Sequence, residues 1–162
     1  MAVSKIVSVE QLAAVSAQCK ASGRVLVFTN GCFDLLHVGH VRYLQAARAR
    51  GDLLAIALNG DDSIRALKGP TRPLNSELER AEVLAALACV DFVTLFHSPR
   101  ATEVIQEIRP QLYVKGGDYT VDALDPGERA ALEAVGAAIE ILELVPGKST
   151  TAIIHKMANP HA

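Results

Sequence analysis

The stretch that decides the fold is Val27-Phe-Thr-Asn-Gly-Cys-Phe-Asp-Leu-Leu-His-Val-Gly-His40. The residues from Arg24 to Phe28 predict a short apolar strand, and Asn30-Gly31 predicts a tight turn directly after it. A helix that carries His37 and His40 is expected to follow. Such a junction leaves several backbone N–H groups free at the start of the helix, where anions bind well. The stretch therefore predicts a site that handles phosphate groups.

Strand-like apolar runs and helical patterns alternate along the rest of the chain. Ser8 and Gln11 match the N-terminal capping box of a helix that should end near Gly23. The expected strands are residues 25–29, 53–59, 92–95, 112–115 and 139–144. The expected helices are residues 39–50, 61–67, 76–88, 102–108 and 126–135, and one that begins at about residue 150. Strands that are apolar on both faces and separated by helices predict an α/β fold, a Rossmann-like, doubly wound, five-stranded parallel sheet.

Composition limits the class of protein. The 162 residues, half of them hydrophobic, predict a single domain over 1–162, with an N-terminal helix at about 8–22 and a core at about 24–158. A net charge of −2 argues against a general nucleic-acid binder. Cys19, Cys32 and Cys89 lack the spacing of a disulfide framework, and no apolar run reaches the length of a membrane span. We expect a cytoplasmic protein with neither a nucleic-acid nor a membrane partner.

Polar and glycine-rich segments follow four of the expected strands. They are Thr29-Asn30-Gly31, Asn59-Gly60-Asp61, Lys115-Gly116-Gly117-Asp118 and Pro146-Gly147-Lys148-Ser149-Thr150-Thr151. In open parallel sheets ligands bind outside the carboxyl ends of the strands. The sequence therefore predicts that these four segments meet at one binding site.

The pair His37 and His40 has three interpretations. Residues three apart share one face of a helix, so the two rings could donate to one phosphate. They could also be helix-start histidines that are satisfied by the backbone. With Cys32 and Asp34 they could bind zinc, although the spacing differs from the usual zinc pairs and no second cluster follows. Magnesium would more readily arrive on a nucleotide triphosphate.

Two further segments fit phosphate binding without requiring it. Residues 147–150 read Gly-Lys-Ser-Thr like the end of a P-loop, but Leu142 stands where the first P-loop glycine is needed. They suit either a phosphate-binding helix start or an ordinary Ser/Thr N-cap. Lys68 and Arg72 lie on a proline-stiffened loop, either as a positioned clamp or as solvated cations. No local Ser-His-Asp or Cys-His pairing, nucleophile elbow or dinucleotide fingerprint is present, which disfavours covalent catalysis and NAD chemistry.

Taken together, these motifs resemble the heptose 1-phosphate adenylyltransferases of the His-x-Gly-His nucleotidyltransferase superfamily. The resemblance extends over about residues 8–156 and is carried by Thr29-Asn-Gly-Cys-Phe-Asp-Leu-Leu-His-Val-Gly-His40, Leu58-Asn-Gly-Asp61, Leu67-Lys-Gly-Pro-Thr-Arg-Pro73, Val90-Asp91, Val114-Lys-Gly-Gly-Asp-Tyr119 and Ser149-Thr-Thr151. It implies transfer of AMP from ATP to D-glycero-β-D-manno-heptose 1-phosphate by direct displacement. This activity is often the C-terminal half of a bifunctional kinase/adenylyltransferase, and the printed sequence resembles the stand-alone form.

The roles that follow from this resemblance are expectations for three groups of residues. The catalytic group is His37, His40 and Lys68. The nucleotide-binding group is Phe28, Thr29, Asn30, Gly31, Cys32, Phe33, Gly39, Lys115, Gly117, Asp118, Ser149, Thr150 and Thr151. The group that binds substrate is Asp34, Asn59, Asp61 and Arg72. The expected cofactor is Mg²⁺ carried by the ATP, with no metal held by the protein itself. The expected partners are ATP and a sugar 1-phosphate, and relatives of this kind often form homodimers.

Two other functions stay open. A cytidylyltransferase for glycerol 3-phosphate or another polyol phosphate would share the superfamily motif. Such enzymes typically carry arginines where this chain has Ala88 and Leu144, which argues against them. A regulatory nucleotide-binding domain without catalysis is disfavoured by the intact pair His37 and His40. One departure from the heptose pattern is Lys148, where bulkier or aromatic residues are common.

Overall fold

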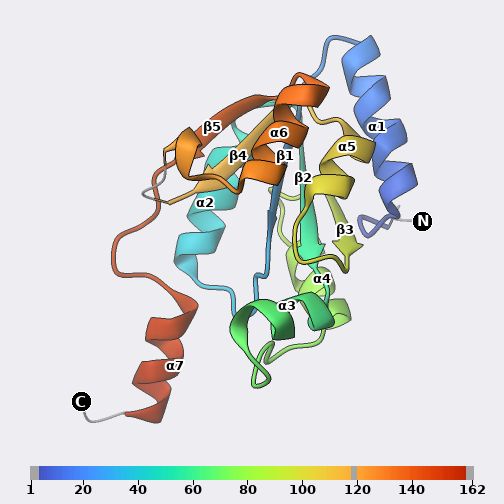
Figure 1. Cartoon of the computed structure of the whole chain (residues 1–162). Coiled ribbons are helices and arrows are strands. Elements are labelled where there is room, and N and C mark those ends of the chain that lie inside the picture. Colours follow the sequence, from blue (N-terminus) through green and yellow to red (C-terminus); the bar gives the residue numbers. More distant parts are fainter. Residues whose placement is uncertain (1–3, 118–119, 160–162) are drawn as a thin grey trace.

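The computed structural model of the protein describes residues 4–117 and 120–159. Five parallel strands form one sheet in the order β3-β2-β1-β4-β5 (Figure 1). The strands are β1 (Leu26–Gly31), β2 (Leu53–Asn59), β3 (Phe92–Phe96), β4 (Leu112–Gly116) and β5 (Ala138–Leu142). The predicted Rossmann-like sheet is confirmed.

Helices cover both faces of the sheet, as the doubly wound prediction requires (Figure 1). On one face α1 (Val9–Ala21), α5 (Thr102–Ile108) and α6 (Pro126–Val135) pack against Phe28, Ala55 and Tyr113. On the other face α2 (Val38–Arg48) and α4 (Glu77–Ala85) pack against Val27, Ile56 and Val114. Alternate residues of each strand thus enter opposite cores, which is why the strands are apolar throughout.

Local capping signals set several helix ends where the sequence predicts them. The Ser8 hydroxyl accepts the N–H of Gln11, and the Gln11 side chain accepts the N–H of Ser8 in return. Ser76 and Glu79 form the same reciprocal pair at the start of α4. Each pair satisfies backbone donors that a helix start otherwise leaves unpaired. The capping-box prediction for the first helix is confirmed.

The start of the site differs from its prediction. The expected Asn30-Gly31 turn is wrong, because both residues continue β1 and pair with Ala57 and Leu58 of β2. The chain changes direction later, at Phe33, whose φ of 43° lies in the left-handed region. His37 also lies outside the helix, as the N-cap residue of α2.

Two helices lie beyond the strand ends. The helix α3 (Asp61–Lys68) follows β2 and ends at the lysine of the predicted cationic loop, and a short 3₁₀ turn, η1 (Val121–Ala123), precedes α6. The last helix, α7 (Thr150–Ala158), has no buried residue and stands apart from the sheet (Figure 1). It is joined to the loop before α2 by the Thr150 hydroxyl, which donates to the carbonyl of Leu35 at 2.9 Å. Within the described residues, no helix has the length and apolar character needed to cross a membrane.

Candidate active site

The strands β1 and β4 pair only over their first residues. Val27 pairs with Leu112 and Phe28 with Tyr113, whereas β1 continues along β2 as far as Gly31. The strand order reverses here, because β2 and β3 lie on one side of β1 while β4 and β5 lie on the other. Ligands in open α/β sheets bind at such a switch point. The backbone of Thr29 to Gly31 therefore faces the opening on its β4 side.

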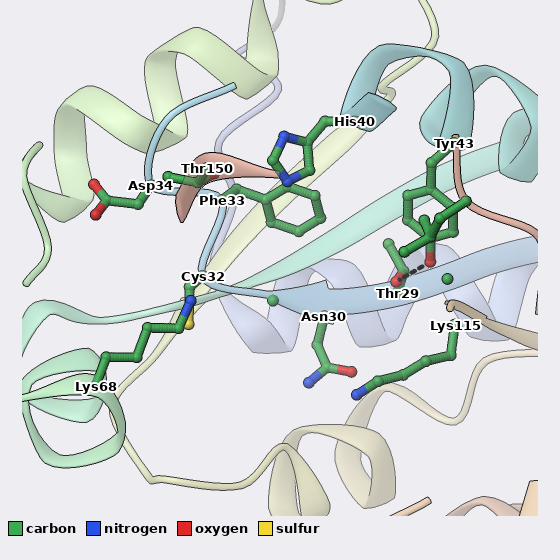
Figure 2. A pocket seen from close by; sticks show the side chains of 13 residues that line it. Thr29, Asn30, Cys32, Phe33, Asp34, His40, Tyr43, Lys68, Lys115 and Thr150 are labelled. Carbon is green, nitrogen blue, oxygen red and sulfur yellow. Dashed lines mark hydrogen bonds between the residues drawn. The ribbon is translucent and has the colours of Figure 1, made fainter. Parts of the chain in front are cut away.

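A cavity of about 240 Å³ occupies this opening (Figure 2). The Lys68 and Lys115 side chains lie on either side of Asn30, and His40 lies above the Phe33 ring (Figure 2). The residues that line this inner cavity are Thr29, Asn30, Gly31, Cys32, Phe33, Asp34, His40, Tyr43, Lys68, Lys115, Gly116, Leu144 and Thr150. Two ammonium groups in one cavity favour an anionic ligand.

The two histidines are held by reciprocal contacts at the start of α2. The Nδ1 atom of His37 accepts the N–H of Gly39 at 3.1 Å, and the Nδ1 atom of His40 accepts the N–H of His37 at 3.3 Å. The ring centroids lie 3.9 Å apart. Because Nδ1 is the acceptor in both rings, each neutral imidazole carries its proton on Nε2. Each ring can therefore donate one hydrogen bond to a ligand.

Both rings are neutral at neutral pH. Burial, followed by the charges of His37 and Lys68, lowers the pKa of His40 from 6.5 to about 4. Burial and the charge of Lys148 lower the pKa of His37 below its ordinary value. The positive end of α2 acts in the same direction, because it disfavours a second positive charge. The pair therefore offers hydrogen-bond donors, and the lysines nearby supply the full charges.

A second cavity of about 270 Å³ adjoins the first. The residues that line this outer cavity are His37, Gly39, His40, Lys68, Arg72, Leu144, Val145, Lys148, Ser149, Thr150 and Thr151. His40 and Lys68 line both cavities, so they lie where the two meet. The outer cavity lies between the starts of α2 and α7, and helix starts attract anions. The arrangement suits a ligand with a chain of phosphates.

Most of the residues predicted from the sequence are brought together here. Those that line one or both cavities are Thr29, Asn30, Gly31, Cys32, Phe33, Asp34, His37, Gly39, His40, Lys68, Arg72, Lys115, Ser149, Thr150 and Thr151. Ser149 is also the N-cap of α7, where its hydroxyl accepts the N–H of Ala152. For this segment the two interpretations from sequence, helix cap and phosphate site, are compatible.

Four predicted residues line neither cavity. The Phe28 side chain is fully buried in the core, and its strand pairs on both sides at that residue. Asn59 is buried and donates to the Ser63 hydroxyl at 2.8 Å. Asp61 binds the guanidinium of Arg80, and Gly117 lies just beyond β4. For Phe28, Asn59 and Asp61 the structure shows internal contacts, and their predicted ligand contacts stay predictions. The predicted residue Asp118 lies outside the described residues.

Asp34 lines the inner cavity but is used internally. Its carboxylate accepts the N–H groups of Leu74 and Asn75 and lies 3.5 Å from the Nε atom of Arg72. The carboxylate therefore orders the loop that carries Arg72. The predicted substrate contact of Asp34 stays a prediction.

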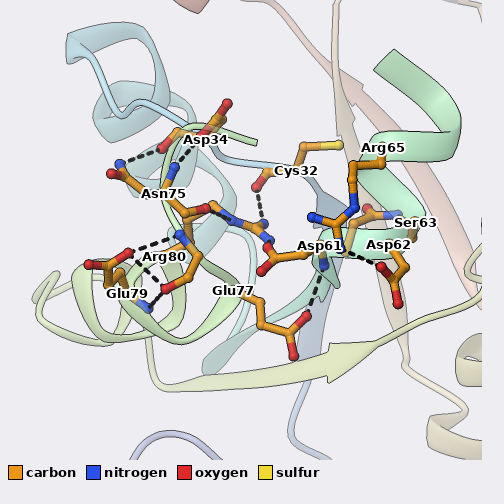
Figure 3. A network of polar contacts seen from close by, with 12 residues as sticks. Cys32, Asp34, Asp61, Asp62, Ser63, Arg65, Asn75, Glu77, Glu79 and Arg80 are labelled. Carbon is orange, nitrogen blue, oxygen red and sulfur yellow. Dashed lines mark hydrogen bonds and ion pairs between the residues drawn. The ribbon is translucent and has the colours of Figure 1, made fainter. Parts of the chain in front are cut away.

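Arg80 is the residue that sequence reasoning missed. Its guanidinium is fully buried and donates to the carbonyls of Cys32 and Asn75 and to the carboxylate of Asp61 (Figure 3). These acceptors belong to the loop after β1, the loop before α4 and the start of α3. Arg80 thus joins three segments around the site. The sequence signal for Arg80 was its position directly before Ala81, on the face of the α4 helix that is buried. An arginine on a buried face indicates a structural hydrogen-bond or ion-pair partner.

The zinc alternative does not agree with the geometry. In residues 4–117 and 120–159, no three His, Cys, Asp or Glu side chains lie close enough to hold a metal ion. The Nδ1 atoms of His37 and His40 accept backbone N–H groups, and Asp34 does the same. Burial raises the pKa of the Cys32 thiol, which disfavours the thiolate that zinc requires.

Known proteins resemble this chain both in sequence and in structure. The bifunctional protein HldE of Geotalea uraniireducens is 52% identical over 153 residues, which are 94% of this chain and 31% of that protein. HldE of Syntrophotalea carbinolica is 51% identical over 154 residues, 95% of this chain and 31% of the relative. This chain thus spans about a third of the length of these curated relatives.

Solved structures share the fold. The crystal structure of the lipopolysaccharide core biosynthesis protein from Thermoplasma volcanium superposes with a TM-score of 0.61 at 27% identity, over 76% of this chain and 98% of that one. Pantoate-beta-alanine ligase from Francisella tularensis, at 13% identity and a TM-score of 0.56, covers 87% of this chain and 67% of its own and shares the fold alone. The model of the cytidylyltransferase-like family matches residues 28–156, which include β4, most of β1 and both helix starts of the site. The chain belongs to the cytidylyltransferase-like family.

Proposed function

We propose that this protein is a nucleotidyltransferase that transfers AMP from ATP to a sugar 1-phosphate, namely D-glycero-β-D-manno-heptose 1-phosphate. The products are ADP-heptose and pyrophosphate. The observation that carries the proposal is the pair of neutral imidazoles, each with Nε2–H free to donate, beside Lys68 where two cavities meet. The relatives about half identical over nearly the whole chain support the choice of pathway.

The reaction is a direct in-line displacement. A phosphate oxygen of the sugar 1-phosphate attacks the α-phosphorus of ATP, and the bond from that phosphorus to the oxygen bridging to the β-phosphate breaks. Pyrophosphate leaves with that electron pair. The attacking phosphate is already ionised near neutral pH, so the protein needs no general base. Its contribution is alignment and stabilisation of charge on the phosphoryl oxygens.

We assign these tasks to residues at the junction of the cavities. His37 and His40 donate from Nε2 to oxygens that gain charge as the new bond forms. Lys68, at the end of α3, supplies a full positive charge beside them. The open backbone of β1, with Lys115 at the end of β4, holds the inner part of the substrates. The start of α7 receives phosphates through Ser149 and Thr151.

Three parts of the proposal rest on the family resemblance. Mg²⁺ would enter as part of the ATP complex, where it offsets the triphosphate charge. The described residues that line the outer cavity offer cations, imidazoles and hydroxyl groups to the phosphates of such a complex. We also propose that the protein works in the cytoplasm and that it forms a homodimer.

Pyrophosphate release tests the proposal. The assay crosses ATP, CTP and GTP against both anomers of heptose 1-phosphate and against glycerol 3-phosphate, with magnesium present. Release with ATP and the β-anomer is the expected result. Alanine at either histidine should lower turnover about 10²- to 10³-fold if the ring stabilises the transition state. Turnover near the wild-type rate in both single variants would show that the histidines have another role.

A second candidate is a cytidylyltransferase for a polyol phosphate, favoured by the description of the matching family. Release with CTP and glycerol 3-phosphate alone would establish it. ATP binding without release for any acceptor would instead favour a regulatory nucleotide-binding domain.

A further inference from the structure

Lys148 lies where the starts of two helices, α2 and α7, approach each other. It follows Gly147, which has a φ of 71°, and precedes Ser149, the N-cap of α7. A Cβ atom added to Gly39 would lie 3.2 Å from the Cβ of Lys148. The stem of Lys148 therefore packs against the first turn of α2, on the side where His37 lies. The contact places the start of the Lys148 side chain at the outer cavity, and the residue as a whole is exposed.

The charges around the outer cavity are unbalanced. Lys68, Arg72 and Lys148 line it, and none of the lining residues among 4–117 and 120–159 is acidic. Arg72 is partly offset by Asp34, at 3.5 Å. Among the described residues, no carboxylate lies within 4.0 Å of the Lys148 ammonium group. A cation without a counterion, between two helix starts, is a site for an anion.

The rest of the lining indicates which anion. Histidine donors, hydroxyl groups and cations line the outer cavity, and only Leu144 and Val145 are large aliphatic residues. This surface offers little to a nucleobase and no acceptor carboxylate for sugar hydroxyls. A chain of phosphates matches it, and the junction at His40 and Lys68 leaves room for that chain to extend outward.

We propose that Lys148 binds the β- and γ-phosphates of the nucleotide, the part that leaves as pyrophosphate. This inference rests on the proposed function, and it assigns a residue at which the chain departs from the heptose pattern. The ammonium group neutralises charge that the leaving pyrophosphate acquires. The same charge lowers the pKa of His37, which keeps that ring a neutral donor.

The test is calorimetric titration of the protein with magnesium pyrophosphate and with magnesium ATP. Lys148→Met should raise the Kd for pyrophosphate about 10- to 100-fold, the range expected for a hydrogen bond to a charged group. Lys148→Arg keeps the charge and should stay within about threefold of the wild type. Lys20→Met is the matched control, because Lys20 lies on α1 at the opposite face of the sheet, and its affinity should not change.

An independent readout is the titration of His37 followed by NMR. Its midpoint should rise in Lys148→Met and stay unchanged in Lys20→Met, because only the first charge acts on that ring. Wild-type affinity for pyrophosphate in a folded Lys148→Met protein would overturn this inference alone. If the wild type binds neither pyrophosphate nor ATP, the proposed function fails as well. Lys148→Gln serves as a second neutral variant, should the methionine protein be poorly folded.

Discussion

Replacing Arg80 with methionine should destabilise the protein strongly although Arg80 lines neither cavity. The guanidinium is fully buried and has three partners. It donates from Nε to the Asn75 carbonyl at 3.0 Å, and from its two terminal nitrogens to the Cys32 carbonyl at 2.7 Å and the Asp61 carboxylate at 2.8 Å. Methionine keeps most of the volume of the side chain and removes all of these donors.

The expected loss in free energy of unfolding follows from the three acceptors that lose the Arg80 donor. Each of the two carbonyls is left without its side-chain partner in a partly buried environment, at about 1–3 kcal/mol apiece. Asp61 has a side chain 25% exposed, so water replaces part of its lost contact. Together these give about 3–5 kcal/mol, which is also the range for breaking a buried ion pair. For a chain of this length that corresponds to a fall in Tm of roughly 6–20 °C.

Thermal and guanidinium unfolding, followed by circular dichroism, measures this change. Arg65→Met is the matched control, because Arg65 pairs with Asp62 on the exposed surface of α3. Because an exposed ion pair is screened by solvent, Arg65→Met should change the Tm far less than Arg80→Met does. A Tm for Arg80→Met within about 2 °C of the wild type would refute the argument. It would mean that the loops at Cys32 and Asn75 are held by other contacts.

Three further predictions concern pH, a buried hydroxyl and a glycine. The pKa of His40 lies at about 4 in the folded protein against 6.5 ordinarily, so the unfolded chain takes up the proton first as pH falls. Stability should therefore decline from about pH 6.5 toward pH 4, and His40→Gln should flatten that decline in denaturant titrations; equal slopes for both proteins would contradict this. Thr94→Val removes a buried hydroxyl that has no partner among the described residues and should raise the Tm by a few degrees, about 1 kcal/mol; a lower Tm would reveal a partner for that hydroxyl. Gly39→Ala puts a Cβ 2.8 Å from the His37 ring and should lower turnover at least about tenfold while the Tm changes little; unchanged turnover would show that the ring can move without loss.

The fold was predictable where local signals agree with the sheet. Residues 53–59, 102–108 and 126–135 form the expected elements at the expected bounds, because apolar runs and periodicity are local signals. For 126–135 the Asp125 cap and Pro126 add a local start signal. Asn30-Gly31 was misjudged for the opposite reason. A local turn signal there is overridden by pairing with β2, a segment more than twenty residues away. The strand order, which brings β1 beside β4, is likewise not a local property.

The site was predictable at the level of residues and less so at the level of contacts. Motifs at strand ends meet because parallel strands share one carboxyl edge, so Lys68, Lys115 and Thr150 could be grouped in advance. The contacts of Asp34, Asn59 and Asp61 depend on which groups the fold brings next to them. Asp61 accepts a hydrogen bond from Arg80, and Asp34 accepts one from the N–H of Leu74. A polar residue near a binding site can therefore stabilise the loops around the site.

The His-x-Gly-His spacing follows from these same contacts. An N-cap side chain and the third helical residue can exchange hydrogen bonds with the helix start only when they lie three apart, as His37 and His40 do. Because each Nδ1 atom accepts a backbone N–H group, the Nε2–H group of each ring can donate to a ligand. The two capping histidines therefore supply two donors. Glycine is favoured directly before His40, because a Cβ at position 39 would meet both the His37 ring and Lys148. The spacing of the two histidines in this motif is therefore explained first by helix capping, because both neutral imidazoles accept backbone N–H groups at the start of α2.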